Sequence, residues 1–258
     1  MLAIRHLFIV FPPQNPHHRP SSIVGGLALS ARSHPFRFFA RVVLALALVT
    51  ALVGALQADW DFSQISRMAE AVHGPLGAGK GRIDAWQRLL AEQKQVPEAR
   101  KLEVVNLFFN HEVVYREDID VWHVDDYWAT PIELLWKGAG DCEDYAIGKY
   151  FSLRHLGVDR DKLRITYVKA LRQNRAHMVL TYYATPTSMP LVLDSLEDAI
   201  EPADHREDLV PVYSFNGEGL YLPGAGGNKK VGDSKRLSRW QDVIKKMQAE
   251  GFPVDPDN

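Results

Sequence analysis

Apolar residues recur every three to four positions in the chain beyond residue 58. This spacing predicts amphipathic helices in three segments, at residues 62–72, 82–93 and 97–111. A fourth segment begins near Asp141, is apolar on most of its faces and stops at Gly157, which predicts a largely buried helix. Residues 116–126 are charged and show no period, so we expect a loop there.

Thr130, Pro131 and Glu133 form a helix-start pattern. The threonine is a good N-cap, proline suits the first helical position, and an acidic residue suits the first turn. We therefore expect a short helix through Trp136, ended by the glycines that follow it.

After residue 157 the hydrophobic period changes from about 3.6 to 2, and β-branched and aromatic residues become frequent. These features predict strands at residues 163–170, 177–184 and 191–196. Weaker strands are expected at 212–215 and 219–222, around the turn Asn216-Gly217, and a final amphipathic helix at 234–248. Helices followed by a meander of strands indicate an α+β fold.

The composition is that of an ordinary globular protein, with 258 residues, 46% hydrophobic and 24% charged. The net charge of −2 gives no basic field and predicts no nucleic-acid partner. Charge is unevenly distributed. Residues 1–58 hold five arginines and no Asp, Glu or Lys, so the remaining 200 residues carry 30 − 5 = 25 basic and 32 acidic side chains, a net of −7. We predict two domains of the sequence, an N-terminal extension at 1–58 and a folded domain at 59–258.

The extension ends in fifteen uncharged, mostly apolar residues, 42–56, which follow Arg37 and Arg41. A membrane-spanning helix needs about 20 apolar residues, whereas the apolar region of a secretory signal needs about 7–15. Leu56-Gln57-Ala58 is a passable cleavage site. We predict a secretory signal peptide, with an uncleaved membrane anchor as the alternative.

Cys142 is the only cysteine, so no intramolecular disulfide forms. An unpaired thiol in an exported protein is a liability that needs a reason. One reason is simple packing, because free cysteine behaves as a small apolar residue. The other is nucleophilic chemistry, since Cys142 falls in the first turn of a helix, where the dipole and free N–H groups favour a thiolate.

A cysteine nucleophile needs a base and a group that orients the base. His177 begins one predicted strand and Asp194 lies near the end of the next. A hairpin turn centred between Thr185 and Pro186 gives paired positions that sum to 371, which places His177 directly opposite Asp194. Taken singly, a histidine at a strand start and an aspartate at a strand end are ordinary edge and turn residues. Together with Cys142 they predict a Cys-His-Asp triad.

Three carboxylates, Asp141, Glu143 and Asp144, flank the cysteine. Negative neighbours raise the pKa of a thiol and oppose its activation. They are suitable helix caps, because acidic residues favour the first turn. They are also hard oxygen ligands of the kind Ca²⁺ prefers, although their spacing is not that of an EF-hand. The acidic loop at 117–126 offers further oxygens.

Residues 136–146, WKGAGDCEDYA, with His177 and Asp194 downstream, resemble the bacterial transglutaminase-like cysteine proteinases over about residues 60–250. The resemblance implies a papain-like or transglutaminase-like α+β core, with the triad Cys142, His177 and Asp194. It also implies Ca²⁺-dependent activity through Asp141, Glu143 and Asp144.

The resemblance further implies a periplasmic enzyme of a Gram-negative bacterium. Its substrate would be the N-terminal region of a large repeat adhesin, cut at an Ala-Ala-containing site to promote biofilm dispersal. Its regulator would be the periplasmic domain of an inner-membrane cyclic-di-GMP receptor.

In the cysteine-protease mechanism, Cys142 attacks the scissile carbonyl, His177 transfers the proton and Asp194 sets the imidazole tautomer. The Cys142 N–H is the first oxyanion donor, and the sequence does not identify the second. Three tryptophans wall the cleft, offer a hydrophobic anchor to a partner, or serve ordinary core or surface packing: Trp122, Trp128 and Trp136. The same triad serves acyl transfer, so a transglutaminase or a peptidoglycan amidase is an alternative, and a binding module without catalysis is a third.

Overall fold

The strongly periodic segments of the sequence form the helices and strands of the structure. A computed structural model describes residues 59–223 and 229–254, so the predicted signal segment lies outside the described residues. The helices are α2 (Phe62–His73), α3 (Gly79–Glu92), α4 (Glu98–Glu112), α5 (Asp118–Val121), α6 (Pro131–Lys137), α7 (Cys142–His155) and α8 (Ser238–Ala249). None of the helices in these residues is long and apolar enough to cross a membrane.

Seven strands form one antiparallel sheet in the order β6-β5-β4-β3-β7-β8-β9. They are β3 (Leu163–Ala170), β4 (Arg175–Tyr182), β5 (Leu191–Leu193), β6 (Glu201–Pro202), β7 (Leu209–Asn216), β8 (Gly219–Leu222) and β9 (Lys229–Gly232). A second, parallel pair joins β1 (Val114–Tyr115) to β2 (Ala139–Gly140). This mixture of helices and antiparallel sheet is the predicted α+β class.

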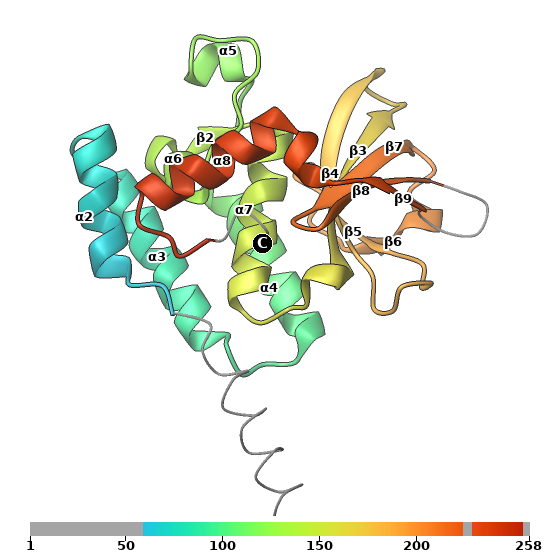
Figure 1. The fold of residues 1–258 in the computed structure, drawn as a ribbon, viewed down its shortest axis with the longest axis horizontal. Helices are drawn as coiled ribbons and strands as arrows, with labels where there is room; N and C mark the ends of the chain where they lie inside the picture. Colours follow the sequence, from blue (N-terminus) through green and yellow to red (C-terminus); the bar gives the residue numbers. More distant parts are fainter. Residues whose placement is uncertain (1–58, 224–228, 255–258) are drawn as a thin grey trace, which may run out of the picture. The chain divides into compact units, whose positions relative to one another are not determined.

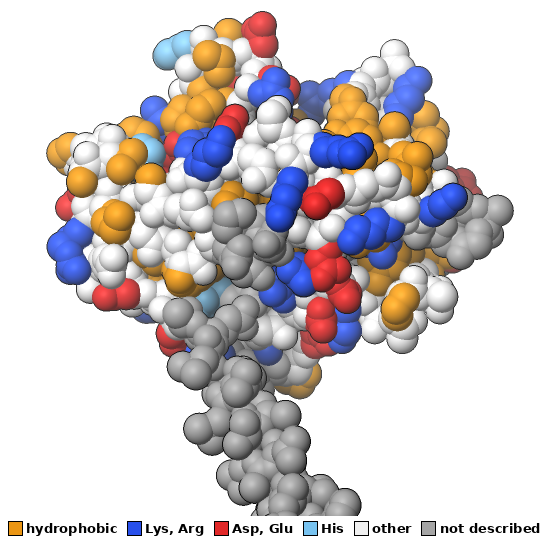
Figure 2. Space-filling view, in the orientation of Figure 1, with side chains coloured by type: hydrophobic (Ala, Val, Ile, Leu, Met, Phe, Trp, Pro, Cys, Tyr) orange, Lys and Arg blue, Asp and Glu red, His pale blue; other side chains and the backbone are white. Residues whose placement is uncertain are grey.

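The helix α7 lies between the other helices and the sheet (Figure 1), and it packs against β4, β3, α4 and α6. Its central position explains why so many of its side chains are apolar: nearly all of them are buried. The rings of four aromatic residues contact one another and join α7, the sheet and α8. Phe151 stacks on Trp240, while Tyr150 meets Phe151 and Phe215 meets Trp240 edge to face. Both signs of charge are mixed on the face that carries α8 (Figure 2).

Several local predictions need correction, among them the boundaries of α3, β4 and β7, which start two or three residues earlier than expected. The loop at 116–126 contains the short helix α5, and the third strand stops at Leu193. The final helix is divided into a 3-10 turn, Ser234–Arg236, and α8. The register of the β4–β5 hairpin pairs Leu180 with Leu193, so paired positions sum to 373 and not 371. The difference of two residues preserves the face on which each side chain points.

Candidate active site

Cys142 is the first residue of α7, and the segment before it is held by a strand pair and by the cap of the helix. The parallel pair β1–β2 aligns Tyr115 with Gly140. Gly140 leaves no room for a side chain, because a Cβ there would lie 2.5 Å from Asp144 Oδ2. Asp141 and Asp144 form a reciprocal capping box. The predicted helix start is therefore present, and it places the thiol at the N-terminal end of a buried helix.

His177 and Asp194 meet in the interior. His177 Nε2 donates to Asp194 Oδ1 at 2.7 Å, and both side chains are fully buried. The other ring nitrogen, Nδ1, is buried and has no hydrogen-bond partner among the described residues. His177 and Cys142 line the same cavity, and the Met178 backbone N–H faces the sulfur. The arrangement leaves Nδ1 free to act as a base within this cavity.

Asp194 is held by residues that the sequence did not single out. Arg206 Nη2 donates to Oδ2 at 2.8 Å and the Leu196 N–H to Oδ1 at 3.1 Å. Burial acts to raise the pKa of Asp194, but the bonds from His177 and Arg206 outweigh it, and the pKa lies below its usual value. Asp194 therefore stays ionised beside His177.

The backbone carbonyl of Asp194 is also fixed. It accepts from Asn110 Nδ2 at 3.0 Å and from Lys149 Nζ at 2.9 Å. Lys149 is fully buried, and burial lowers its pKa to about 7. The sequence did carry a signal for Lys149, because it lies on the most buried helix, seven residues after Cys142. Arg206 and Asn110 come from a loop and an ordinary helix face, where no local pattern marks them.

The cavity at Cys142 has a volume of about 490 Å³. Its walls come from the end of β1 and the segment after it, the chain between α5 and α6, the start of α7, the strands β3, β4 and β7, and residues 236–239 that lead into α8. Of the three tryptophans considered above, Trp128 lines the cavity and stacks on Phe215. Trp122 stacks on Tyr127 and Trp136 on His73, so these two serve packing.

Carboxylates cluster beside the cysteine, as predicted, and the cluster includes Asp118 from the acidic loop. Oxygen atoms of Asp118, Asp141 and Asp144 lie within 4.8 Å of one another, and so do those of Asp118, Asp126 and Glu143. Burial and the neighbouring carboxylates raise the pKa of Asp118 to about 6 and that of Asp141 to about 10. Repulsion of this size between carboxylates must be compensated, either by protons on some of them or by a bound cation.

Two oxygens of this cluster are available to bind a cation. Oδ1 of Asp118 and Oδ1 of Asp141 are buried and have no hydrogen-bond partner among the described residues. The donor set is entirely carboxylate, the ligand type that suits Ca²⁺. Asp144 also has a capping role, because it accepts from the Ala129 N–H at 2.7 Å and the Asp141 N–H at 3.3 Å. The residues present therefore fit a calcium ion.

The same carboxylates act on the thiol. Cys142 Sγ donates to Glu143 Oε2 at 3.0 Å. Burial, together with the charges of Glu143 and Asp141, raises the pKa of the thiol well above its usual value. Without a compensating charge, the thiol stays protonated at neutral pH.

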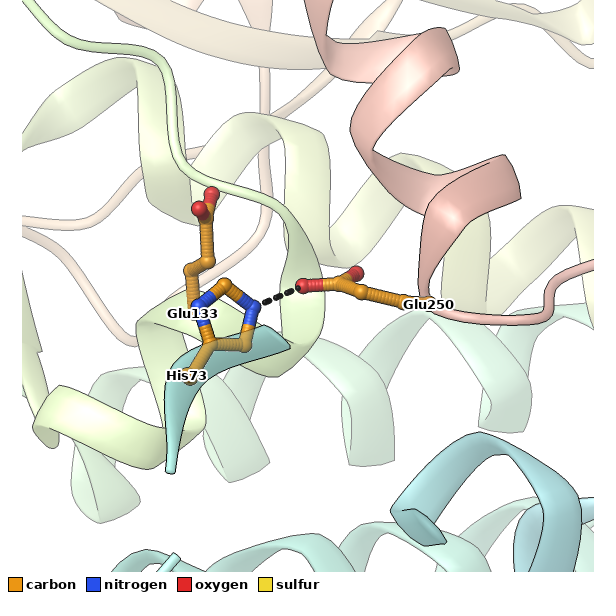
Figure 3. Close-up of side chains that lie close together, drawn as sticks. All are labelled: His73, Glu133 and Glu250. Carbon is orange, nitrogen blue, oxygen red and sulfur yellow. Dashed lines mark hydrogen bonds and ion pairs between the residues drawn. The ribbon is translucent and has the colours of Figure 1, made fainter. Parts of the chain in front are cut away.

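A second group of ligand-type side chains, His73, Glu133 and Glu250, does not line the cavity. It joins the ends of α2 and α8 to the start of α6 (Figure 3). His73 Nε2 donates to Glu250 Oε1 at 2.8 Å, and Thr130 Oγ1 donates to the same oxygen at 2.8 Å. Lys246 Nζ lies 2.7 Å from Glu133 Oε2. The ammonium already neutralises Glu133, and we assign this group to the stability of the helical layer.

Comparisons with known proteins agree with this geometry. The model of the bacterial transglutaminase-like cysteine proteinase family (BTLCP) matches residues 85–207. A solved structure of LapG from Legionella pneumophila is 46% identical, with a TM-score of 0.61, and covers 71% of this chain and 97% of its own. An EGTA-treated form is 45% identical, with a TM-score of 0.63, and covers 71% of this chain and 97% of its own. A calcium-bound form is 44% identical, with a TM-score of 0.61, and covers 71% of this chain and 98% of its own. The comparison with curated proteins found no match.

Proposed function

The chain belongs to the bacterial transglutaminase-like cysteine proteinases, and from this premise we propose that it is a periplasmic, calcium-dependent endopeptidase that cuts the N-terminal region of a large cell-surface adhesin. The observation that carries the proposal is the pair His177–Asp194. His177 lines the cavity that holds Cys142, and its Nδ1 has no hydrogen-bond partner among the described residues.

The protein's own residues supply the protease chemistry. His177 Nδ1 takes the proton of the Cys142 thiol, and the sulfur attacks the scissile carbonyl carbon. The tetrahedral intermediate collapses to a thioester, and His177 passes the proton to the leaving amine. Water, deprotonated by His177, then hydrolyses the thioester and frees the thiol. Asp194 keeps Nε2 protonated throughout, so that Nδ1 is the nitrogen that exchanges protons.

Calcium dependence is supported by the carboxylate cluster and by the calcium-bound LapG structure. Asp118, Asp141, Glu143 and Asp144 would hold the ion, with Asp126 as a further ligand. A divalent cation there supplies positive charge beside the thiol and so lowers the pKa of Cys142. That positive charge would offset the carboxylates around the buried thiol, which is why a nucleophile can lie among them.

The proposed location rests on the family and on residues 42–56, whose uncharged run follows two arginines, and the proposed partners rest on the family alone. Release of the adhesin would promote biofilm dispersal. We extend the proposal to one regulator, the periplasmic domain of an inner-membrane cyclic-di-GMP receptor that sequesters the protease. Co-purification of the two proteins with and without cyclic-di-GMP tests this part separately.

The test of the proposed function is cleavage of the N-terminal region of an adhesin from the same organism, followed on a gel. Samples contain calcium, excess EGTA, or the Cys142→Ala variant. We expect cutting only with both calcium and Cys142. Cutting that persists in EGTA, after bound calcium has been stripped, would contradict the calcium part. A product that gains an added amine would instead identify an acyltransferase.

A further inference from the structure

Tyr115 stands beside the reacting sulfur although it is 27 residues away in sequence. It ends β1, whose parallel pairing with β2 aligns it with Gly140, two residues before Cys142. The Arg116 N–H donates to the Gly140 carbonyl at 2.8 Å and fixes this alignment. Tyr115 and Cys142 both line the catalytic cavity. The strand pairing therefore delivers a phenol to the N-terminal end of α7.

The hydroxyl of Tyr115 has an unused hydrogen. Its oxygen accepts from Arg175 Nη2 at 2.8 Å, and no group among the described residues accepts its hydrogen. Arg175 lies two positions before His177 on β4, so the two side chains share a face of the strand. Arg175 is held in turn by Glu117 Oε1, 2.6 Å from Nη1. Donation by a guanidinium polarises the O–H bond and makes the phenol a stronger donor.

The Tyr115 ring is also well fixed. It stacks on Tyr145, with centroids 6.3 Å apart, and the Tyr145 hydroxyl donates to the Val113 carbonyl at 2.7 Å. Burial raises the pKa of Tyr115, and the charge of the nearby Cys142 raises it further. The phenol therefore remains a neutral donor over the working pH range.

Acyl transfer by a thiol needs two donors for the developing oxyanion. The backbone N–H of Cys142, at the first position of α7, has no intrahelical acceptor and supplies one. We propose that the Tyr115 hydroxyl supplies the other, with Arg175 as its positioning residue. The proposal rests on Cys142 being the nucleophile of the proposed function, but not on the identity of the protein substrate.

The step balances without another reactant. The sulfur forms a bond to the carbonyl carbon while the C=O π pair moves onto oxygen, and Tyr115 O–H and Cys142 N–H donate to that oxygen. When the pair returns, the leaving group departs with the proton from His177. Tyr115 keeps its own proton throughout.

The test compares the wild-type protein with Tyr115→Phe, in calcium, by two reactions of Cys142. Acylation by p-nitrophenyl acetate passes through an oxyanion and releases a coloured phenolate. Alkylation by iodoacetamide displaces iodide and forms no oxyanion. We expect acylation to slow on the order of 10²-fold, with the rate and pH profile of alkylation unchanged. Tyr221→Phe, which removes a phenol outside the cavity, is the control and is expected to leave both rates unchanged.

Three results would overturn the proposal. Acylation at the wild-type rate would show that the hydroxyl is not used. Parallel losses in acylation and alkylation would assign Tyr115 to the thiolate or to folding. Absence of acylation in the wild-type protein would remove Cys142 as the nucleophile. Failure to cut the adhesin with acylation intact would instead contradict only the proposed substrate, and the Tyr115→Phe comparison would still decide the role of the hydroxyl.

Discussion

His177 and Asp194 form a 2.7 Å hydrogen bond without being partners in the sheet. Asp194 is the first residue after β5. Because the register pairs Leu180 with Leu193, Asp194 lies diagonally from His177 on the same face of the sheet. Diagonal neighbours are about 7–8 Å apart at Cα, within reach of an imidazole and a carboxylate. Because the strand ends at Leu193, the ladder does not hold Asp194, and its own side-chain and backbone bonds must do so.

Asp194→Asn is therefore expected to reduce kcat on the order of 10²–10⁴-fold. His177 and Arg206 donate to different oxygens of Asp194. An asparagine has an oxygen at only one of these two positions, so its NH₂ group must face one of the donors. Asp208→Asn is the matched control, because Asp208 also bonds Arg206, at 3.0 Å, but does not touch His177. Steady-state cleavage at saturating substrate measures the effect. More than a tenth of wild-type kcat in Asp194→Asn would contradict it.

Lys149→Met is expected to flatten the pH dependence of stability. Burial lowers the pKa of Lys149 to about 7 in the folded protein, below its usual 10.5. Between these two values the unfolded chain binds more protons than the folded one, so the wild-type free energy of unfolding rises as pH increases from about 7 to 10. The methionine variant lacks this contribution.

Urea unfolding at several pH values in that window measures the slope for each protein. Lys162→Met is the control, because Lys162 is partly exposed and its pKa is raised by the hydrogen bond to Glu98. Equal slopes in wild type and Lys149→Met would count against an uncharged amine in the interior.

Long periodic segments were predictable from the sequence. The strand expected at 163–170 is β3, and the helix expected at 97–111 is α4 within one residue at each end. Two-residue strands such as β1 and β6, and the single turn of α5, are too short to show a period. The fold class follows from the long segments alone, which is why it was predicted correctly.

The contact between His177 and Asp194 was predicted from a register that is wrong by two residues. Ser188 Oγ accepts from the Thr185 N–H and donates to the Thr185 carbonyl. The hairpin is centred one position further along the chain than the prediction placed it. Because the sum of paired residue numbers differs by two, both side chains stay on one face of the sheet. If the sum had differed by one, the prediction would have placed them on opposite faces. The face of a side chain is thus easier to predict than its partner.

The acidic cluster was predicted in part. Asp141, Glu143 and Asp144 are neighbours in sequence, and adjacency is visible there. Asp118 joins them because α5 packs against β2, the strand just before α7, and the Tyr127 N–H donates to Asp118 Oδ2. Nothing in the loop 117–126 distinguishes Asp118 from its other acidic residues, since burial is a tertiary property.

His73→Ala is expected to lower the free energy of unfolding by about 1–3 kcal/mol while leaving kcat unchanged. The variant leaves the buried Glu250 carboxylate with only the Thr130 hydroxyl as a partner, far from the solvent that would otherwise hydrate it. His111→Ala is the control, because the His111–Asp198 pair is exposed and exposed pairs contribute about 0–1 kcal/mol. Denaturant unfolding at pH 7 distinguishes them, and equal losses would contradict the prediction.

Calcium binding is expected to release protons. Burial and mutual repulsion raise the pKa of Asp141 to about 10, so at neutral pH it holds a proton that the ion must displace, since only the carboxylate binds it. Asp118, whose pKa is raised to about 6, holds a proton only at lower pH. Apparent affinity should therefore rise with pH between about 6 and 10, roughly tenfold per unit for each proton released. Titration calorimetry at pH 7 in two buffers of different ionisation enthalpy measures the number of protons released per calcium ion bound.

Two variants serve as test and control for the site. Asp118→Asn should weaken calcium binding, whereas Asp120→Asn, which changes an exposed neighbour outside the cluster, should not. Identical heats in the two buffers would mean that the carboxylates are already ionised, and that the cation compensates repulsion rather than replacing protons.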